Sequence, residues 1–261
     1  MILNAQQIIE HIGAGVAQAL RINTEFLGFD GGEFQNADIH PEYLATVEVA
    51  KQFTAPDRRV SLETHMKNLR QEARAAARLQ RNFPGGWPAI NDILASYRFG
   101  DVDSQRLDIV VRSSESLNLP LLIAEAKLGI KNPSGVIADI DRVLRMLTMY
   151  QDLGLLQSHL IYGAVLFHSM DEGNLTGAIG PKAQEFLDKI RAHLDTVTLT
   201  NSWLTARTDL LTRGTHVQQV TVHLDEYPDG NTEETLAKDG FTFSPGLILL
   251  GNDKDILTAI F

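Results

Sequence analysis

The sequence contains no cysteine among its 261 residues. Disulfide scaffolds, zinc–thiolate fingers, iron–sulfur clusters and cysteine nucleophiles are therefore excluded. Long hydrophobic runs are missing too, because LPLLIA at 119–124 and LILL at 247–250 fall far short of the ~20 residues of a membrane helix. Near the N-terminus, Glu10 and His11 interrupt the apolar stretch that an export signal would need. We expect no membrane span, no export signal and a cytoplasmic location.

The composition is that of an ordinary globular protein, with 44% hydrophobic and 21% charged residues, and we expect a single domain over 1–261. The net charge of −10 is unevenly distributed. Within 58–82, seven arginine and lysine residues accompany only two glutamates, whereas 171–261 carries an excess of seven negative charges. Such a chain can present one basic surface to phosphate groups. Alternatively, the arginines of 58–82 simply solvate an exposed helix face.

Hydrophobic periodicity predicts an α/β protein. Helical spacing is found in 1–22, 41–53, 60–81, 135–154 and 181–194. Strand patterns are found in 95–100, 106–111, 121–128, 160–168, 197–203, 217–227 and 240–251. The predicted order is helices, a three-strand meander, a helix, a strand, a helix and a β-rich tail. We accordingly divide the domain into a helical extension over 1–55, a core over 60–195 and a β-rich segment over 196–261 that packs on the core.

Two predicted strands of the meander carry charged side chains within apolar sequence. Asp108 lies in RLDIVV, and Glu125 and Lys127 share one face of LLIAEAKL. Unpaired charge in such strands costs several kcal/mol, so it tends to persist where it binds a metal or reacts. Two carboxylates, joined by the carbonyl group of Ala126, are hard oxygen ligands suited to Mg²⁺ or Mn²⁺. A neighbouring lysine can hold an attacking water or stabilise charge on a phosphate.

A purely structural interpretation of these charges is also open. The three side chains would then form a buried ion-pair network between neighbouring strands, without a metal. Most E-x-K triplets lie on solvated surface. This triplet is the only one in the chain, and Asp108 precedes Glu125 by 17 residues across a plausible hairpin.

RLDIVV followed by LLIAEAK resembles the D…(D/E)xK signature of the restriction-endonuclease-like, or PD-(D/E)xK, nuclease superfamily. The resemblance implies a core made of a helix, a three-strand meander, a helix and a further strand, which the predicted order over 60–168 matches. It implies that Asp108 and Glu125 bind the metal and that Lys127 serves catalysis. The family often adds a glutamate from the first core helix, for which Glu63 and Glu72 are the candidates, and we prefer Glu63. No proline precedes Asp108.

We therefore expect a Mg²⁺-dependent nuclease that hydrolyses phosphodiester bonds, with nucleic acid, in the first place DNA, as its partner, no membrane partner, and a homodimer as one possible assembly. Basic side chains that could meet phosphates are Arg70, Arg74, Arg78, Arg142 and Arg145. Two other functions stay open. The chain could be a weak or inactive nucleic-acid-binding module of a larger complex, or a structural protein with a buried ion-pair network.

Overall fold

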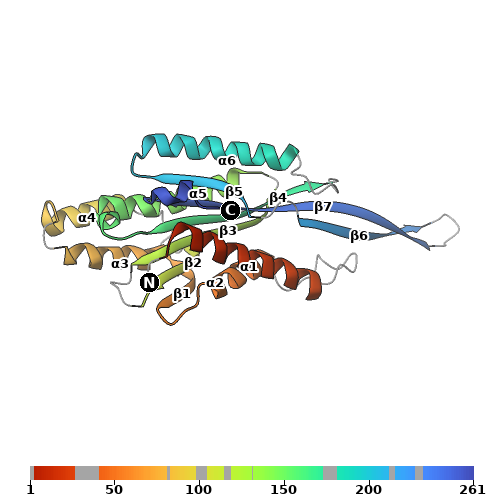
Figure 1. Cartoon of the computed structure of the whole chain (residues 1–261), viewed down its shortest axis with the longest axis horizontal. Coiled ribbons are helices and arrows are strands. Elements are labelled where there is room, and N and C mark those ends of the chain that lie inside the picture. The colour runs from red at the N-terminus through yellow and green to blue at the C-terminus, as the bar shows by residue number, and fades with distance from the viewer. Residues whose placement is uncertain are drawn as a thin grey trace.

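The computed structural model describes residues 3–26, 41–80, 83–97, 105–114, 119–130, 132–172, 181–211, 215–226 and 232–261. It confirms an α/β protein, in which helices cover both faces of a mixed, seven-stranded sheet (Figure 1). The strand order is β1-β2-β3-β4-β7-β5, and β6 pairs with β7 outside this path. No described helix has both the length and the apolar character of a membrane span.

The helices are α1 (Ala5–Phe26), α2 (Pro41–Gln52), α3 (Met66–Leu79), α4 (Gly86–Ser96), α5 (Ser134–Asp152) and α6 (Pro181–Thr200). The strands are β1 (Arg58–His65), β2 (Arg106–Ser113), β3 (Pro120–Ile130), β4 (Tyr162–Glu172), β5 (Thr205–Leu210), β6 (Thr215–Glu226) and β7 (Thr232–Gly251). Two short 3₁₀ helices, η2 (Leu155–Gln157) and η3 (Lys254–Leu257), follow α5 and β7.

The sheet is antiparallel except at one place. β1, β2 and β3 form an antiparallel meander, and β7 pairs antiparallel with β4 and β5. β3 and β4 are parallel, with Leu122 opposite Tyr162 and Lys127 opposite Phe167. A parallel pair needs a long crossover connection, which α5 supplies. This crossover places a helix directly over the strand that carries Glu125.

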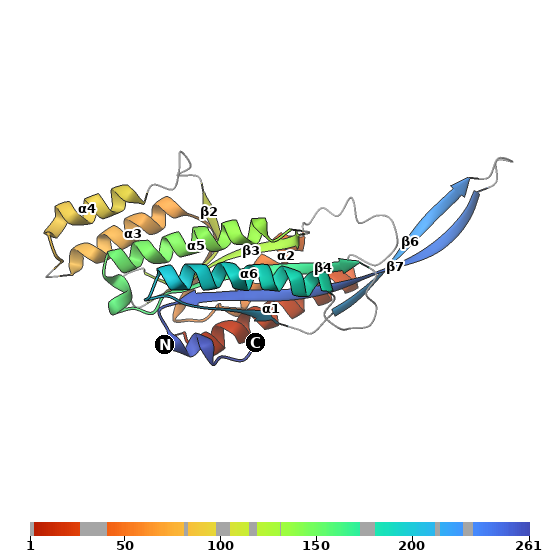
Figure 2. The same cartoon turned by 90° about the horizontal axis from the view of Figure 1, so that it is seen from above.

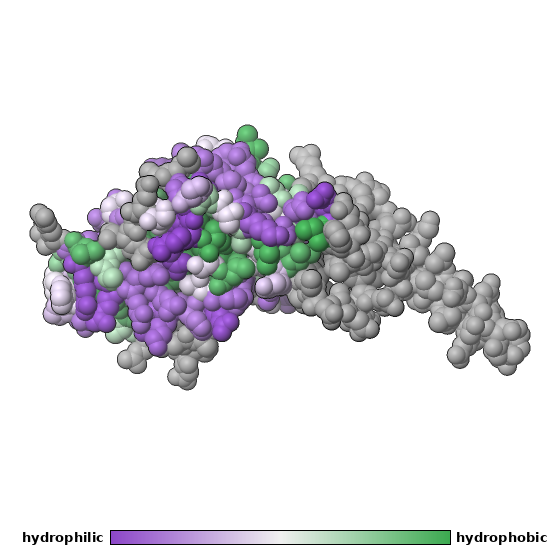
Figure 3. Space-filling view, turned by 90° about the horizontal axis from the view of Figure 1, so that it is seen from below, coloured by the Kyte–Doolittle hydropathy of each residue, from purple (hydrophilic) through white to green (hydrophobic). Residues whose placement is uncertain are grey.

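The alternation of side chains along β3 builds two hydrophobic cores, one on each face of the sheet. Ile123 joins the core formed with α3, α4, α5 and α6. Leu122, Ala124 and Ala126 join the core formed with α1 and α2. The predicted facing of the apolar residues in LLIAEAKL is thus confirmed. Seen from the α1–α2 side, the surface is mostly hydrophilic, with apolar side chains gathered near its centre (Figure 3).

The predicted first-helix region 60–81 was partly wrong. β1 occupies Arg58–His65, and the helix α3 begins only at Met66. The alternation of Val60 and Leu62 with polar residues is a strand pattern, and the helical spacing applies only after it. β1 is therefore the first strand of the meander, and α3 and α4 lie between it and β2.

Two predicted strands were wrong. The start of ASYRFG belongs to α4, which ends at Ser96, and the residues from 98 to 104 lie outside the described ones. VTLTNSW belongs mostly to α6, which continues to Thr200. Threonine-rich sequence favours strands, but here the hydroxyl groups of Thr196, Thr198 and Thr200 donate to carbonyl groups one turn back in the helix. Because the threonine hydroxyl groups find hydrogen-bond acceptors within the helix, this segment can be helical despite its threonine content.

The two ends of the chain join the same body as the core. α1 and α2 pack on β2, β3, β4 and β7 in one hydrophobic cluster. The backbone N–H of Ile260 donates to the side-chain oxygen of Gln6 at 2.8 Å. Beyond the body, β6 and the first half of β7 form a two-stranded ribbon, paired from Thr215–Phe243 to Glu226–Thr232, that projects away from the helices (Figure 2).

Candidate functional site

A fork between β2 and β3 holds the two carboxylates predicted as metal ligands. The antiparallel ladder between these strands ends at the pair Ile109–Ala124. One residue further along each strand, Asp108 lies opposite Glu125. There the backbone N–H of Ala126 donates to Oδ2 of Asp108 at 2.7 Å. A carboxylate thus takes the place of a backbone carbonyl where the two strands separate.

The crossover helix α5 brings an arginine and a third carboxylate onto Glu125. Nη1 of Arg142 lies 2.6 Å from Oε1 of Glu125 and 3.1 Å from Oδ1 of Asp139. Asp139 and Arg142 are three residues apart and so lie on one face of the helix. Glu125 and Asp139 are buried, while the Arg142 side chain is 30% exposed. One guanidinium group therefore forms ion pairs with two buried carboxyl groups.

The three carboxyl groups have raised pKa values. Burial, with the charge of Asp108, raises the pKa of Glu125 to about 8, against the opposing effect of Arg142. Burial also raises the pKa of Asp108. The hydrogen bonds of Asp108 with the Ala126 N–H and with Glu125 lower this pKa and so oppose the effect of burial. Asp139 follows the same pattern, with burial as the main cause. In all three groups burial is the largest cause, because it disfavours the charged form of a carboxyl group.

Lys127 extends the same face of β3 by two residues and is half-buried. Its side chain lies along the beginning of α5, where Cε is 3.7 Å from the position that a Cβ atom at Gly135 would take. The Lys127 charge lowers the pKa of Asp139. The buried partner of Glu125 is thus Arg142, and Lys127 stands at the more open end of the site.

Glu63 lies beside Asp108 on the outer strand β1. The pairs Leu62–Ile109 and Thr64–Leu107 flank these two residues, and the charge of Glu63 raises the pKa of Asp108. We expected Glu63 on the first core helix, and the structure corrects this to a strand. Its φ of 50° is a left-handed conformation that costs a non-glycine residue about 1–2 kcal/mol. The side chain is half-exposed, with Oε2 3.6 Å from Nη1 of Arg106.

Glu72, the alternative to Glu63, lies elsewhere. Its Oε2 accepts a hydrogen bond from Nε of Arg112 at 3.1 Å, which joins α3 to β2. It is not among the groups that shift the pKa of Asp108, whereas Glu63 is. The structure therefore favours Glu63 as the glutamate near the fork.

Sequence reasoning missed two acidic residues of the site. Glu42, in the first turn of α2, raises the pKa values of both Asp108 and Asp139. An acidic residue at the start of a helix is common for dipole reasons alone, so no pattern singled it out. Asp139 could have been found, because an aspartate and an arginine three residues apart follow the E-x-K strand on a largely apolar helix face.

The arginines predicted to meet nucleic acid fall into two groups. Arg142 points into the fork, as described, and Arg145 is exposed on α5. Arg70 and Arg74 line a hollow of about 300 Å³ between α3 and α4, where Arg74 donates to Oδ1 of Asn91 at 2.8 Å. The guanidinium of Arg78 lies 4.6 Å from the ring centroid of Trp87, which is 61% exposed. Trp87 therefore offers an exposed ring on α4 next to this arginine.

The donor set of the fork suits a small divalent cation. Among the described residues, no three histidine, aspartate or glutamate side chains lie close enough together to hold a metal ion by themselves. The set is instead Asp108, Glu125 and the carbonyl group of Ala126, which faces the Asp108 side because the N–H and C=O of a strand residue point the same way. All of these donors are oxygen atoms, which are the ligands that Mg²⁺ and Mn²⁺ prefer.

Compared with protein-family models, with curated proteins and with solved structures, the chain gives no significant match to any of them. An assignment of function therefore rests on the geometry of the fork.

Proposed function

We propose that the chain is a Mg²⁺-dependent nuclease with a restriction-endonuclease-like core, which hydrolyses phosphodiester bonds in DNA. The observation that carries the proposal is the fork, where Asp108 and Glu125 meet with raised pKa values and Lys127 stands beside them. The element order supports the proposal in part, because a helix precedes a meander of β1, β2 and β3, and α5 then crosses to the parallel strand β4. That helix is α2, whereas the expected first core helix was 60–81. The departure is the insertion of α3 and α4 after β1.

Each residue of the fork has a role in this reaction. Asp108, Glu125 and the Ala126 carbonyl would hold the ion, which supplies positive charge to the phosphate and to the attacking water. Lys127 positions that water or stabilises the charge that grows on the phosphate. Hydrolysis forms a bond from the water oxygen to phosphorus and breaks the bond from phosphorus to one deoxyribose oxygen, which takes up the proton that the water releases. Glu63, beside Asp108, is an outer ligand that would act through water.

Arg142 acts as the internal counter-ion of Glu125. Its guanidinium occupies Oε1 of Glu125 at 2.6 Å and also pairs with Asp139. A phosphate group in the fork would compete for this cation, and the release of Glu125 would favour metal binding. We therefore expect DNA and the divalent ion to bind with mutual reinforcement.

The test is cleavage of duplex, single-stranded, nicked and RNA substrates with Mg²⁺ or Mn²⁺. We expect cleavage by the wild type and a loss of about 10²–10³-fold for Lys127→Ala, which removes one stabilising cation. Asp108→Asn should abolish the calorimetric signal of Mn²⁺ binding. Lys189→Ala, which changes an exposed lysine of α6 in a surface pair with Glu185, is the matched control and should leave both readouts unchanged. No cleavage of any substrate, together with no divalent binding, would falsify the proposal.

The strongest second candidate is a structural ion-pair network. The observation in its favour is that Arg142 already bridges two buried carboxyl groups. It predicts that EDTA leaves the melting temperature unchanged and that Mg²⁺ does not raise it, whereas a metal site predicts stabilisation by added Mg²⁺. A nucleic-acid-binding module without catalysis would instead show salt-sensitive DNA binding that Lys127→Ala does not change.

A further inference from the structure

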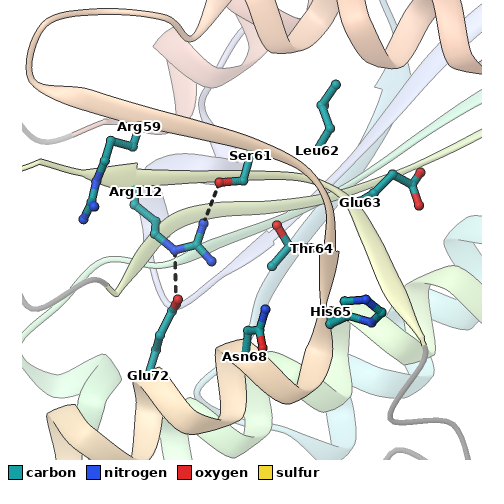
Figure 4. Close-up of a pocket in the computed structure, with 9 residues that line it drawn as sticks. All are labelled: Arg59, Ser61, Leu62, Glu63, Thr64, His65, Asn68, Glu72 and Arg112. Atoms are coloured by element: carbon teal, nitrogen blue, oxygen red, sulfur yellow. Dashed lines mark hydrogen bonds and ion pairs between the residues drawn. The ribbon is translucent and has the colours of Figure 1, made fainter.

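A polar pocket of about 390 Å³ lies beside the fork, between the outer strand β1 and the helix α3 (Figure 4). Its size is at the lower end of the range for small-ligand sites. Glu63 belongs to its lining and also lies next to Asp108, so the pocket adjoins the candidate active site. From Glu63 to Arg59 the strand extends by about 13 Å, the reach of one or two nucleotides.

One wall of the pocket holds a buried arginine whose position is fixed by hydrogen bonds. Arg112 is 7% exposed, and its guanidinium donates to Glu72 at 3.1 Å and to Ser61 at 3.2 Å. Figure 4 shows Thr64 and Asn68 facing the same space as Arg112 and Glu72, while Leu62 points away from it. Donors and acceptors therefore alternate around one small volume.

Two side chains at this wall have hydrogen-bonding capacity that no described residue uses. Thr64 is 7% exposed, and its hydroxyl has no partner among the described residues. Nδ1 of His65 is also buried and has no hydrogen-bond partner among the described residues. A buried polar group without a partner costs about 1–3 kcal/mol, so a ligand that turns these two side chains toward the pocket and bonds to them would offset that cost.

The charge of the lining indicates the class of ligand. Arg59 and Arg112 are balanced by Glu63 and Glu72, so the pocket does not favour a free anion such as phosphate. It favours a neutral, planar group that offers donors and acceptors along its edge. Among the parts of a nucleic acid, only the bases have this chemistry, and single-stranded bases are commonly read through hydrogen bonds to their edges.

We propose that this pocket binds one unstacked base of the nucleic-acid strand whose backbone lies in the fork, with Thr64, Asn68 and the Arg112–Glu72 pair reading its edge. This inference rests on the proposed nuclease function. It adds that the protein acts on a strand with an accessible base close to the cleaved bond, so single-stranded or frayed DNA binds better than an intact duplex.

The experiment uses the full chain in EDTA, so that the DNA stays intact, and single-stranded oligonucleotides with 2-aminopurine at successive positions. We expect a rise in fluorescence at one position, since the base leaves the stack there. Asn68→Ala and Thr64→Val should each weaken binding by about three- to tenfold and remove the rise, because each deletes a hydrogen bond to the base. Gln71→Ala, an exposed residue of α3 outside this pocket, is the control and should behave as wild type.

The outcomes separate this inference from the function on which it rests. Oligonucleotide binding with no position that brightens, or with Asn68→Ala and Thr64→Val unchanged, overturns the base pocket even if the protein cleaves DNA in Mg²⁺. Brightening that both substitutions remove, in a protein that neither cleaves nor binds divalent ions, keeps the pocket and overturns the nuclease. Unchanged melting temperatures of both variants exclude misfolding as the cause.

Discussion

Two arginine side chains connect the sheet to the helices that cover it, and they differ in their balance of charge. Arg112 of β2 meets one carboxylate, Glu72 of α3, and the Arg112 side chain is only 8% exposed. Arg142 of α5 meets Glu125 and Asp139, close to Asp108, so one cation faces three carboxyl groups. The first is a closed pair that holds a helix in place. The second leaves three carboxyl groups around one arginine, an arrangement that supports the proposed metal site.

The largest expected effect concerns the closed pair. Arg112→Met should lower the free energy of unfolding by about 2–3 kcal/mol, because it leaves Glu72 partly buried without its cation. Urea unfolding of the variant measures this loss. The double variant Arg112→Met/Glu72→Leu should recover much of the stability, since no charge is then left unpaired. If Arg112→Met were as stable as wild type, the Arg112–Glu72 pair would not stabilise the contact between β2 and α3.

A pH dependence of comparable size is expected at the open site, the group of carboxyls around Arg142. The pKa of Glu125 is raised to about 8 from an ordinary value of 4.5, so between these pH values the folded protein binds a proton that the unfolded chain has released. Stability should therefore fall as the pH rises from about 5 to 8 in EDTA. Glu125→Gln should flatten this fall, measured by urea unfolding at several pH values. A fall of the same size in the variant would assign the effect to other groups.

Arg142→Met sharpens the comparison, because removing this arginine should act on metal binding more than on folding. The variant frees Glu125 from its counter-ion, so at a pH high enough to keep Glu125 ionised we expect Mn²⁺ to bind about tenfold more tightly by calorimetry. The loss of stability should be smaller than for Arg112→Met, since the Arg142 side chain is 30% exposed and Glu125 can take up a proton. Unchanged Mn²⁺ affinity would show that Arg142 and the ion do not compete.

The smallest effects are expected on the surface of α3. Arg70→Ala and Arg74→Ala should each reduce the slope of log affinity against log salt by about 0.7–0.9 if each arginine neutralises one phosphate. Binding titrations at several salt concentrations measure the slope. Lys189→Ala on α6 is again the control, because it removes an exposed cation from a different element. Slopes equal to wild type would leave these arginines as solvated residues of the α3–α4 surface.

Much of the site was accessible from the sequence because its residues stand out against apolar strands. Asp108 and Glu125 were predicted from charge within RLDIVV and LLIAEAKL, and the structure brings them together at the fork. The partner of Glu125 was not predicted. Which of Lys127 and Arg142 reaches a buried carboxylate depends on how α5 packs over β3, and no local pattern contains that information.

The errors in the fold have a similar origin. β1 was predicted as helix because its eight residues run directly into α3 without a turn signal, and the alanines and arginines of α3 dominate the window. The end of α6 was predicted as strand because threonine propensity outweighed hydrogen bonds that appear only within the helix. Interior segments with one clear period, such as α5 and β4, were predicted correctly.

The position of Arg142 and Asp139 on the crossover helix links the order of assembly to the ionic state of the site. β3 can pair with β2 as a local hairpin, but α5 is held in place only when β4 docks in parallel beside β3. Until then Glu125 has no arginine next to it. Before that docking step Glu125 lies on the hairpin without Arg142 and Asp139, so the group of three carboxyls around one arginine is complete only once the crossover has closed. A chain cut after β3 would keep the signature residues and lack the electrostatics that make them useful.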